Sequence, residues 1–214
     1  MINFRLFGIP VTILPWFWAT MGIIGALSLG LESSQDFLRL ALFMLAGFIS
    51  ILVHELGHGL TIKKFGADTQ IVLQSFGGFA TYPRNRFSRL QDFLVTAAGP
   101  AIQLLLGGVI HLILVNTNLP ETQGKFFLHI LVGISIFWAV FNCVPIYPLD
   151  GGQMLNAILG PKRRKVTHTV GVIAAILLGL FALYAGFMFM AIFAGMFAYQ
   201  NYQLLQGKNP QSPF

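Results

Sequence analysis

Long apolar segments separated by short polar ones dominate the chain. Six segments are apolar enough to cross a membrane as helices: Trp16–Leu31, Phe37–Phe65, Leu90–Val115, Phe127–Phe141, Val166–Tyr184 and Phe187–Leu205. A transmembrane helix needs about 20 apolar residues, and somewhat fewer where the bilayer is thin. The last two segments form one apolar stretch of about 40 residues, which is twice that length and must turn back, with Ala185-Gly186 as the best position for the turn. The pattern therefore predicts an all-α membrane protein with about six transmembrane helices.

The overall composition supports an integral membrane protein. Of all residues 56% are hydrophobic and only 9% are charged, and the mean hydropathy is +0.74. A soluble domain carries about a quarter charged residues. The single cysteine excludes an intramolecular disulfide and a metal site made of several thiolates. We expect one polytopic domain over residues 1–205 and a short polar cytoplasmic tail over 206–214, with no removable signal peptide and no attached regulatory domain.

The basic residues are distributed unevenly between the two sides of this predicted membrane protein. Of the 13 Lys and Arg residues, all but Arg39 and Lys125 fall in loops or termini on one side. Because positively charged loops stay in the cytoplasm, this bias predicts six crossings with both termini cytoplasmic, in a prokaryotic cell membrane. The net charge of +6 is thereby explained by topology, and we expect no nucleic-acid partner because the charges are spread over several loops. The basic run Lys162–Lys165 is expected to contact anionic lipid headgroups of the bilayer.

The second apolar segment contains the motif His54-Glu55-Leu56-Gly57-His58. Ionisable groups at bilayer depth cost roughly 2.5–3.5 kcal/mol each on insertion scales, so they are usually present for function. On a helix, His54 and His58 share one face and can together hold a zinc ion. Glu55 can then act as general base toward a water molecule that the metal activates. The motif thus predicts a zinc hydrolase site within the membrane.

A second polar motif covers residues 142–152, after the fourth apolar segment. Four residues that disfavour a regular helix interrupt it: Pro145, Pro148, Gly151 and Gly152. Irregular backbone at membrane depth is tolerated only where it is buried in protein or lines a wet cavity. We therefore predict a loop that dips into the protein and carries Asn142 and Asp150 at its ends. Because a catalytic zinc usually has three protein ligands, Asp150 is the natural third ligand; the other acidic residues lie in or beside loops.

With both motifs present, the chain resembles the site-2 proteases, which are intramembrane zinc metalloproteases. The hallmark of that family is HExxH on one transmembrane helix and an NxxPxxPLDG-like motif on a later one. Both are complete here, at His54–His58 and Asn142–Gly151. Weaker resemblances are the segments Leu6–Val11, Phe76–Ala80 and Ala97–Pro100. One departure is Leu14-Pro15, where many relatives have His-Pro.

The resemblance implies an endopeptidase with one zinc ion per chain. Zinc would be held by His54, His58 and Asp150. Glu55 would take a proton from the attacking water and deliver it to the leaving amine. The resemblance assigns Asn142 to the oxyanion that forms on the scissile carbonyl, although Asn142 could instead satisfy backbone groups freed by Pro145.

The substrate is expected to be a transmembrane protein or peptide whose helix unwinds for cleavage. The segment Thr69–Tyr82 is rich in strand-forming residues and predicts a short β-hairpin or re-entrant segment with its turn at Gly77-Gly78. A free strand edge can hold an extended peptide by main-chain hydrogen bonds. The candidate substrate contacts are therefore Phe76, Gly77, Gly78 and Phe79. The alternative is a scaffold hairpin that does not meet substrate.

Two other functions compete with a protease. One is a catalytically silent metalloprotein that binds transmembrane helices, but an intact Glu55 disfavours it because binding alone needs no base. The other is a metal transporter, which would place polar ligands along a path rather than at one depth. His58 lies about seven residues before Phe65, or roughly 10 Å at 1.5 Å per residue, which predicts a site in the cytoplasmic half of the membrane.

Overall fold

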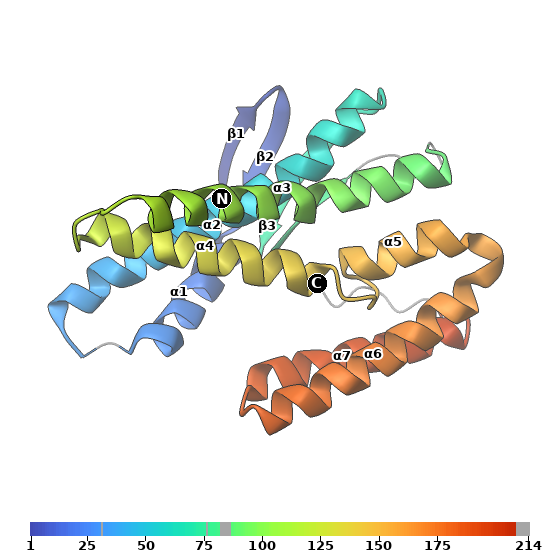
Figure 1. Ribbon diagram of the computed structural model, residues 1–214. Coiled ribbons are helices and arrows are strands. Elements are labelled where there is room, and N and C mark those ends of the chain that lie inside the picture. The colour runs from blue at the N-terminus through green and yellow to red at the C-terminus, as the bar shows by residue number, and fades with distance from the viewer. Residues whose placement is uncertain (31, 76, 82–86, 209–214) are drawn as a thin grey trace. The chain divides into compact units, whose positions relative to one another are not determined.

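The computed structural model describes residues 1–30, 32–75, 77–81 and 87–208, and these are mostly helical with one small β-sheet (Figure 1). The chain divides into two compact units. The first contains Met1–Arg86 and Ala98–Val140, and the second contains Phe87–Ala97 and Phe141–Phe214. Helix α3 (Arg89–Asn116) therefore gives its first turns to the second unit and the remainder to the first.

The first unit contains a four-stranded mixed sheet. Its strands lie in the order β1 (Ile2–Leu6), β2 (Ile9–Ile13), β3 (Gln70–Gln74) and β4 (Gly77–Thr81). Phe7 and Gly8, both with positive φ, make the tight turn between the antiparallel strands β1 and β2. Strands β2 and β3 are parallel, and β3 and β4 are antiparallel, so β4 is an edge strand.

The structure confirms the predicted hairpin and corrects two details of it. Gly77 pairs with Gln74 and Gly78 with Leu73, so the two glycines are the first residues of β4 and do not form the turn. The sheet also has two more strands than the hairpin provides, because the N-terminal residues pair with it. Strands β1 and β2 are only five residues long, and β2 contains Pro10. The sequence therefore carries no clear signal for these two strands.

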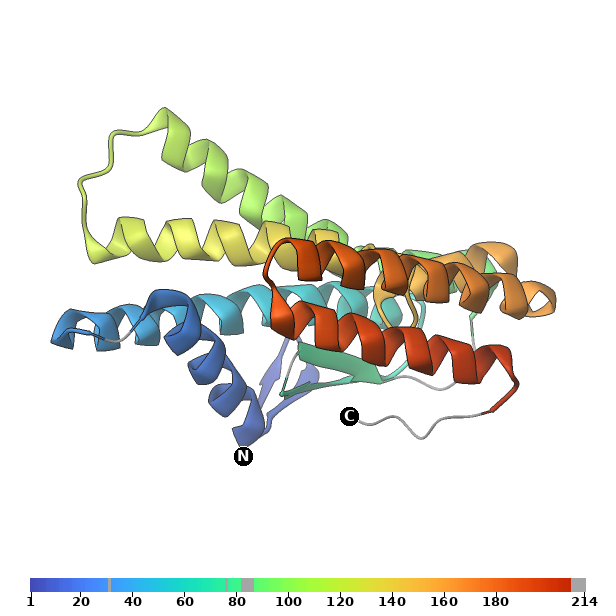
Figure 2. The same cartoon turned by 90° about the horizontal axis from the view of Figure 1, so that it is seen from below.

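One face of this sheet packs on the first two helices, α1 (Pro15–Leu29) and α2 (Ser34–Lys64). Every second residue of β2 and β3 is buried, as expected for strands with one covered face. The sheet residues of this core are Ile9, Val11, Ile13, Ile71 and Leu73, and the helix residues are Phe17, Met21, Ile51, Leu52 and Leu56. Figure 2 shows the sheet along the C-terminal half of α2, where the histidine motif lies.

Helix α2 has well-defined ends. At its start, the backbone N–H and the hydroxyl of Ser33 both donate to the Asp36 carboxylate at 2.8 Å, within a capping box. At its end, Lys63 and Lys64 stand where the negative end of the helix dipole favours cations. The 31 residues between these ends are long enough to cross a bilayer. Helix α4 (Gln123–Asn142), apart from its last two residues, completes the helices of this unit.

The second unit contains helix α5 (Asp150–Leu159), a short 3-10 turn (Pro161–Arg163) and two long helices. Helices α6 (Arg164–Tyr184) and α7 (Met188–Leu205) run antiparallel and side by side in both views (Figures 1 and 2). The turn between them contains Gly186 with φ of 78°, which confirms the predicted turn at Ala185-Gly186. Ile146, Ala175 and Phe197 form the buried core of this unit.

The predicted loop has Asn142 and Asp150 at its ends, as expected, but the two glycines that follow belong to a helix. The loop begins after α4 ends at Asn142, as the motif predicts, and it ends before Asp150, so Gly151 and Gly152 lie in helix α5. A Cβ atom at Gly151 would overlap the carbonyl oxygen of Cys143, and one at Gly152 would overlap the backbone nitrogen of Tyr147. The glycines are thus required by close packing of the helix on the loop rather than by an unusual backbone shape.

Each of the six predicted apolar segments corresponds to a helix, with boundaries that agree within four residues. Among the described residues, four helical segments are long and apolar enough to cross a membrane: Ser34–Lys64, Arg89–Asn116, Gln123–Asn142 and Pro161–Tyr184. Helix α1 is apolar but only 15 residues long, which is shorter than a usual span. Helix α7 carries Gln200, Asn201 and Gln203 near its end and is less apolar than the four. The chain is therefore a multi-pass membrane protein, with four spans shown by these criteria.

Candidate metal centre

Two buried imidazoles face one another on helix α2. His54 and His58 are 4% and 9% exposed, and they lie one helical turn apart. Their Nε2 atoms are 3.0 Å apart, and the rings are nearly perpendicular at 80°. Two nitrogen ligands at 2.0–2.1 Å from a tetrahedral zinc ion are about 3.3 Å from each other. The pair therefore has nearly the spacing that one zinc ion requires.

A glycine on the neighbouring helix keeps the space in front of these nitrogens clear. A Cβ atom at Gly99 of α3 would overlap Nε2 of His58 and lie 2.9 Å from Nε2 of His54. Both imidazoles thus point at the space beside Gly99, and the side chain of any larger residue at position 99 would fill that space. Neutral imidazole nitrogens suit zinc. The residues of the first unit fit a zinc ion at this position.

Small residues allow α3 to approach α2 closely at this point. A Cβ atom at Gly57 would lie 2.5 Å from the carbonyl oxygen of Ala98 and 2.7 Å from the Ile102 side chain. Gly57 is the fourth residue of the histidine motif, and Ala98 precedes Gly99. Close contact between the two backbones brings the Gly99 position to the imidazoles.

The other ring nitrogen of His54 has a polar partner on α3. Nδ1 of His54 is 2.9 Å from Oε1 of Gln103, and Nε2 of Gln103 donates to Oγ of Ser50 at 2.8 Å. Oγ of Ser50 is in turn 2.9 Å from Oγ of Ser135 on α4. The sequence reasoning missed Gln103. Gln103 could have been noticed in the sequence as a single amide residue in the apolar stretch after Pro100, one helical turn beyond Gly99.

Strand β4 lies directly against the predicted general base. Glu55 is 4% exposed, and a Cβ atom at Gly78 would lie 2.7 Å from its Cγ and 3.0 Å from its Cδ. Gly77 and Phe79 flank Gly78 on the same edge strand, and Phe79 is exposed. The first unit thus brings Glu55 beside one of the four candidate substrate contacts, Gly78, and two others are its neighbours along the strand. The fourth candidate, Phe76, lies outside the described residues.

The remaining two predicted site residues belong to the second unit. Asn142 is the last residue of α4 and is half-buried, and Asp150 is the first residue of α5 and is buried. The positive end of the α5 dipole favours a carboxylate at that first turn. The roles of Asp150 as a third ligand and of Asn142 as an oxyanion donor remain predictions.

An asparagine on α7 holds the loop that precedes Asp150. Nδ2 of the fully buried Asn201 donates to the carbonyl oxygens of Tyr147 at 2.6 Å and of Phe197 at 2.9 Å. The Tyr147 ring also packs edge-on against His168, with ring centroids 5.9 Å apart. Gly171 on α6 makes room for Asn201, because a Cβ atom there would overlap the amide oxygen. The sequence reasoning did not identify Asn201, whose signal is a polar residue at the buried face of an otherwise apolar helix.

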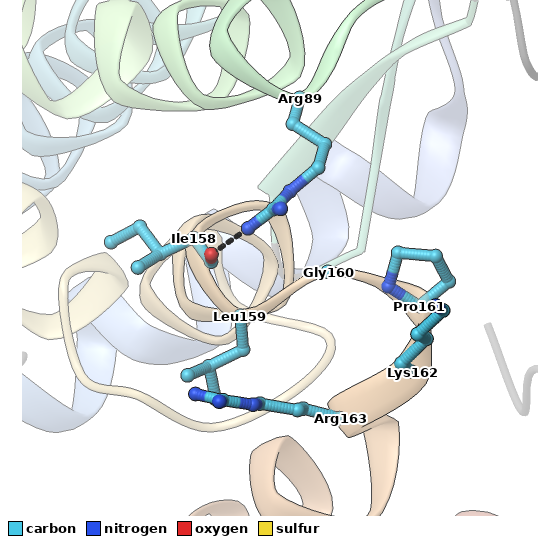
Figure 3. Close-up of a pocket in the computed structure, with 7 residues that line it drawn as sticks. All are labelled: Arg89, Ile158, Leu159, Gly160, Pro161, Lys162 and Arg163. Atoms are coloured by element: carbon cyan, nitrogen blue, oxygen red, sulfur yellow. Dashed lines mark hydrogen bonds between the residues drawn. The ribbon is translucent and has the colours of Figure 1, made fainter.

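An arginine closes the opposite end of α5. Nε of Arg89 donates to the carbonyl oxygen of Ala157 at 2.8 Å, and Nη2 donates to that of Ile158 (Figure 3). The last carbonyls of a helix have no partner within it, so a side-chain donor there stabilises the helix end. Arg89 also lines a cavity of about 540 Å³ with Lys162 and Arg163. Both ends of the Asp150-bearing segment are therefore tied to other elements of the second unit.

Cys143, next to Asn142, is a poor candidate for a metal ligand. Loss of hydration, followed by the charge of Asp150, raises the pKa of the Cys143 thiol above its ordinary value, although the residue is exposed. A raised pKa disfavours the thiolate, which is the form that binds zinc.

Comparisons with known proteins agree with this site. A family model described as peptidase family M50 matches residues 42–122 and 106–186, a range that includes both motifs. A Synechocystis protein provisionally named a zinc metalloprotease is 33% identical over 164 residues, which cover 72% of this chain and 42% of that protein. A zinc metalloprotease of Methanocaldococcus jannaschii is 27% identical over 186 residues, covering 84% of this chain and 53% of its own. The chain thus spans about half the length of these curated relatives.

A solved structure has a similar fold along the whole chain. The site-2 protease from Methanocaldococcus jannaschii matches with a TM-score of 0.68 and 25% sequence identity, over 100% of this chain and 99% of that one. The resemblance predicted from the two motifs is therefore confirmed.

Proposed function

Because the chain belongs to peptidase family M50, we propose that it is a zinc-dependent intramembrane endopeptidase. It hydrolyses peptide bonds in or near transmembrane segments of membrane-protein substrates. The observation that carries this proposal is the buried pair of Nε2 atoms, 3.0 Å apart, with Glu55 beside them on an apolar helix long enough to span a bilayer. No observation favours the metal transporter or the catalytically silent helix-binding protein.

The proposed zinc ligands are His54 and His58, through Nε2, and Asp150 through a carboxylate oxygen. The support for Asp150 is its chemistry, its burial and its position in the motif that the family model also covers. Three protein ligands leave one position open, as in catalytic zinc sites. When bound, zinc supplies a Lewis acid that polarises a carbonyl and makes water a nucleophile near neutral pH.

Glu55 is the proposed proton carrier of the reaction. Its carboxylate takes the proton of the attacking water and passes it to the amine that leaves. Asn142 is proposed to donate its side-chain N–H to the oxyanion, where one such donor is commonly worth roughly 3–4 kcal/mol. An amide donor stays neutral, so it suits a site from which water is largely excluded.

Strand β4 is the proposed binding edge for the unwound substrate. Among the described residues, no strand pairs with its outer edge, and Gly78 brings the strand against Glu55. An extended peptide added to this edge would place its backbone near the general base. Gly77, Gly78 and Phe79 are the proposed contacts, and Phe76 is kept as a candidate from the sequence.

The proposed topology has six crossings with both termini in the cytoplasm of a prokaryotic cell. The uneven distribution of basic residues supports this topology. The four clear spans become six if the shorter helix α1 and the less apolar helix α7 also cross the membrane. Residues 1–205 then act as one protease domain whose site lies in the cytoplasmic half of the membrane. Cleavage is expected on the cytoplasmic side.

The test compares the full chain in detergent with its Glu55→Gln variant on a single-span test substrate. Glu121→Gln is the matched control, because it makes the same chemical change in an exposed loop between α3 and α4. We expect about one zinc ion per chain in all three proteins. We expect cleavage by the wild type and Glu121→Gln but not by Glu55→Gln, since Gln cannot accept the proton.

Two other results would count against the proposal. Zinc in all three proteins without cleavage of any single-span substrate would favour a binding protein. A folded wild type without zinc would exclude the metal centre itself.

A further inference from the structure

Three fully buried polar side chains lie behind the metal-facing side of His54. They are Ser50 on α2, Gln103 on α3 and Ser135 on α4, all within the first unit. A buried amide or hydroxyl costs free energy unless it is hydrogen-bonded. Within an apolar helix bundle, these three side chains satisfy one another. The series of hydrogen bonds that joins them ends on His54.

The partners determine which way the Gln103 amide points. Its Nε2 lies 2.8 Å from Oγ of Ser50 and 3.4 Å from the backbone oxygen of Ser50. A backbone oxygen only accepts hydrogen bonds, so the amide nitrogen of Gln103 faces Ser50 and its oxygen faces His54. Oγ of Ser50 accepts from Gln103 and can give its own proton to Ser135, 2.9 Å away.

The amide orientation in turn determines the tautomer of His54. Oε1 of Gln103 is 2.9 Å from Nδ1 of His54, and an amide oxygen only accepts, so Nδ1 carries the proton. A neutral imidazole protonated at Nδ1 has its free lone pair on Nε2. Nε2 is the atom that faces His58 and the space kept clear by Gly99.

We propose that Gln103 is a positioning residue of the metal centre. It holds His54 in the tautomer and ring orientation that present Nε2 to zinc, while Ser50 holds Gln103. The inference rests on the proposed zinc site and adds a residue outside both sequence motifs. Removal of the hydrogen-bond partner of a metal-binding histidine typically weakens metal binding by about 10–100-fold.

The experiment measures zinc affinity of the full chain in detergent by competition with a chelator. Gln103→Met keeps the length of the side chain and removes its acceptor, and we expect about 10–100-fold weaker zinc binding. Gln103→Glu keeps an acceptor toward Nδ1–H, so zinc affinity should stay within about threefold of the wild type, a smaller change than loss of the partner causes. Ser135→Ala is the control for a role in helix packing only. It removes a distant hydrogen bond and should lower thermal stability while leaving zinc affinity within the same range.

Two outcomes would overturn the proposal. Wild-type zinc affinity in Gln103→Met would show that Gln103 only joins helices, and equally weak binding in Gln103→Glu would exclude the acceptor role. A wild type without zinc in the same assay would instead reject the metal centre and hence the proposed function. The two failures are thereby distinguished.

A second measurement does not depend on folding of the Met variant. Nitrogen-15 NMR of the zinc-loaded chain, with His111, His129 and His168 replaced by Asn, reads the protonated nitrogen of the two remaining rings. The ring whose N–H signal shifts in Gln103→Glu is His54, and we expect its proton on Nδ1. A proton on Nε2 of that ring would overturn the proposal.

Discussion

Two glycines on different elements leave the space that the reaction site needs. Gly99 on α3 borders both imidazoles, and Gly78 on β4 borders the Glu55 carboxylate. A methyl group at either position would meet a proposed functional atom. At the scale of single residues, the absence of a side chain is therefore as important as the side chains of the histidine motif.

Gly99→Ala tests the space at the metal position. The added methyl would overlap Nε2 of His58, so we expect zinc content to fall by about tenfold or more, comparable with loss of a supporting residue. Gly108→Ala on the same helix is the matched control, because nothing lies within 4 Å of its Cβ position. Alanine favours a helix over glycine by roughly 1 kcal/mol, so the control should bind zinc fully and be at least as stable. Full zinc content in Gly99→Ala would place the metal elsewhere.

At the scale of elements, α5 and the loop before it are held from both ends. Asn201 on α7 donates to the loop carbonyl of Tyr147, and Arg89 on α3 donates to the last carbonyls of α5. Gly151 and Gly152 let α5 pack on the loop. The segment that presents Asp150 is thus fixed by contacts from helices that carry no proposed catalytic group.

Asn201→Leu tests the hold on this loop. Leucine is similar in size but leaves the Tyr147 carbonyl oxygen without the donor that it has at 2.6 Å. Loss of one partner from a buried hydrogen bond costs about 1–3 kcal/mol, so the unfolding temperature of the detergent-solubilised protein should fall. Tyr202→Phe changes an exposed residue next to Asn201 and should leave that temperature unchanged. Equal unfolding temperatures for all three proteins would show that the loop does not depend on Asn201.

At the scale of the whole molecule, the number of crossings depends on the two least typical helices. If α1 and α7 both cross, the strong bias of basic residues gives six spans and cytoplasmic termini. If α7 did not cross, Lys208 would lie on the same side as the turn between α6 and α7.

Cysteine labelling in intact cells separates these cases, because replacement of the single Cys143 by Ser gives a background without thiols. In that background, a membrane-impermeant maleimide should label Thr122→Cys, in the outer loop. Lys208→Cys should be labelled only after lysis. Labelling of Lys208→Cys in intact cells would contradict six crossings.

The helices and the two polar motifs could be located from the order of the residues alone. Hydropathy is a local property, so six apolar segments located six helices, and the turn at Gly186 followed from the length of a bilayer span. The zinc-binding pair also followed locally, because residues four apart on a helix share a face.

The surroundings of those motifs, in contrast, depend on how distant parts of the chain fold together. The pairing of β2 with β3 joins residues about 60 positions apart, and the bond from His54 to Gln103 joins residues 49 apart. The local periodicity of apolar and polar residues does not reveal contacts between residues so far apart. Gly99 and Gly151 carry no chemistry of their own, and their importance appears only when the neighbouring backbone and imidazoles are in place. Close packing between distant segments is a property of the folded chain, and for that reason the motifs alone did not reveal it.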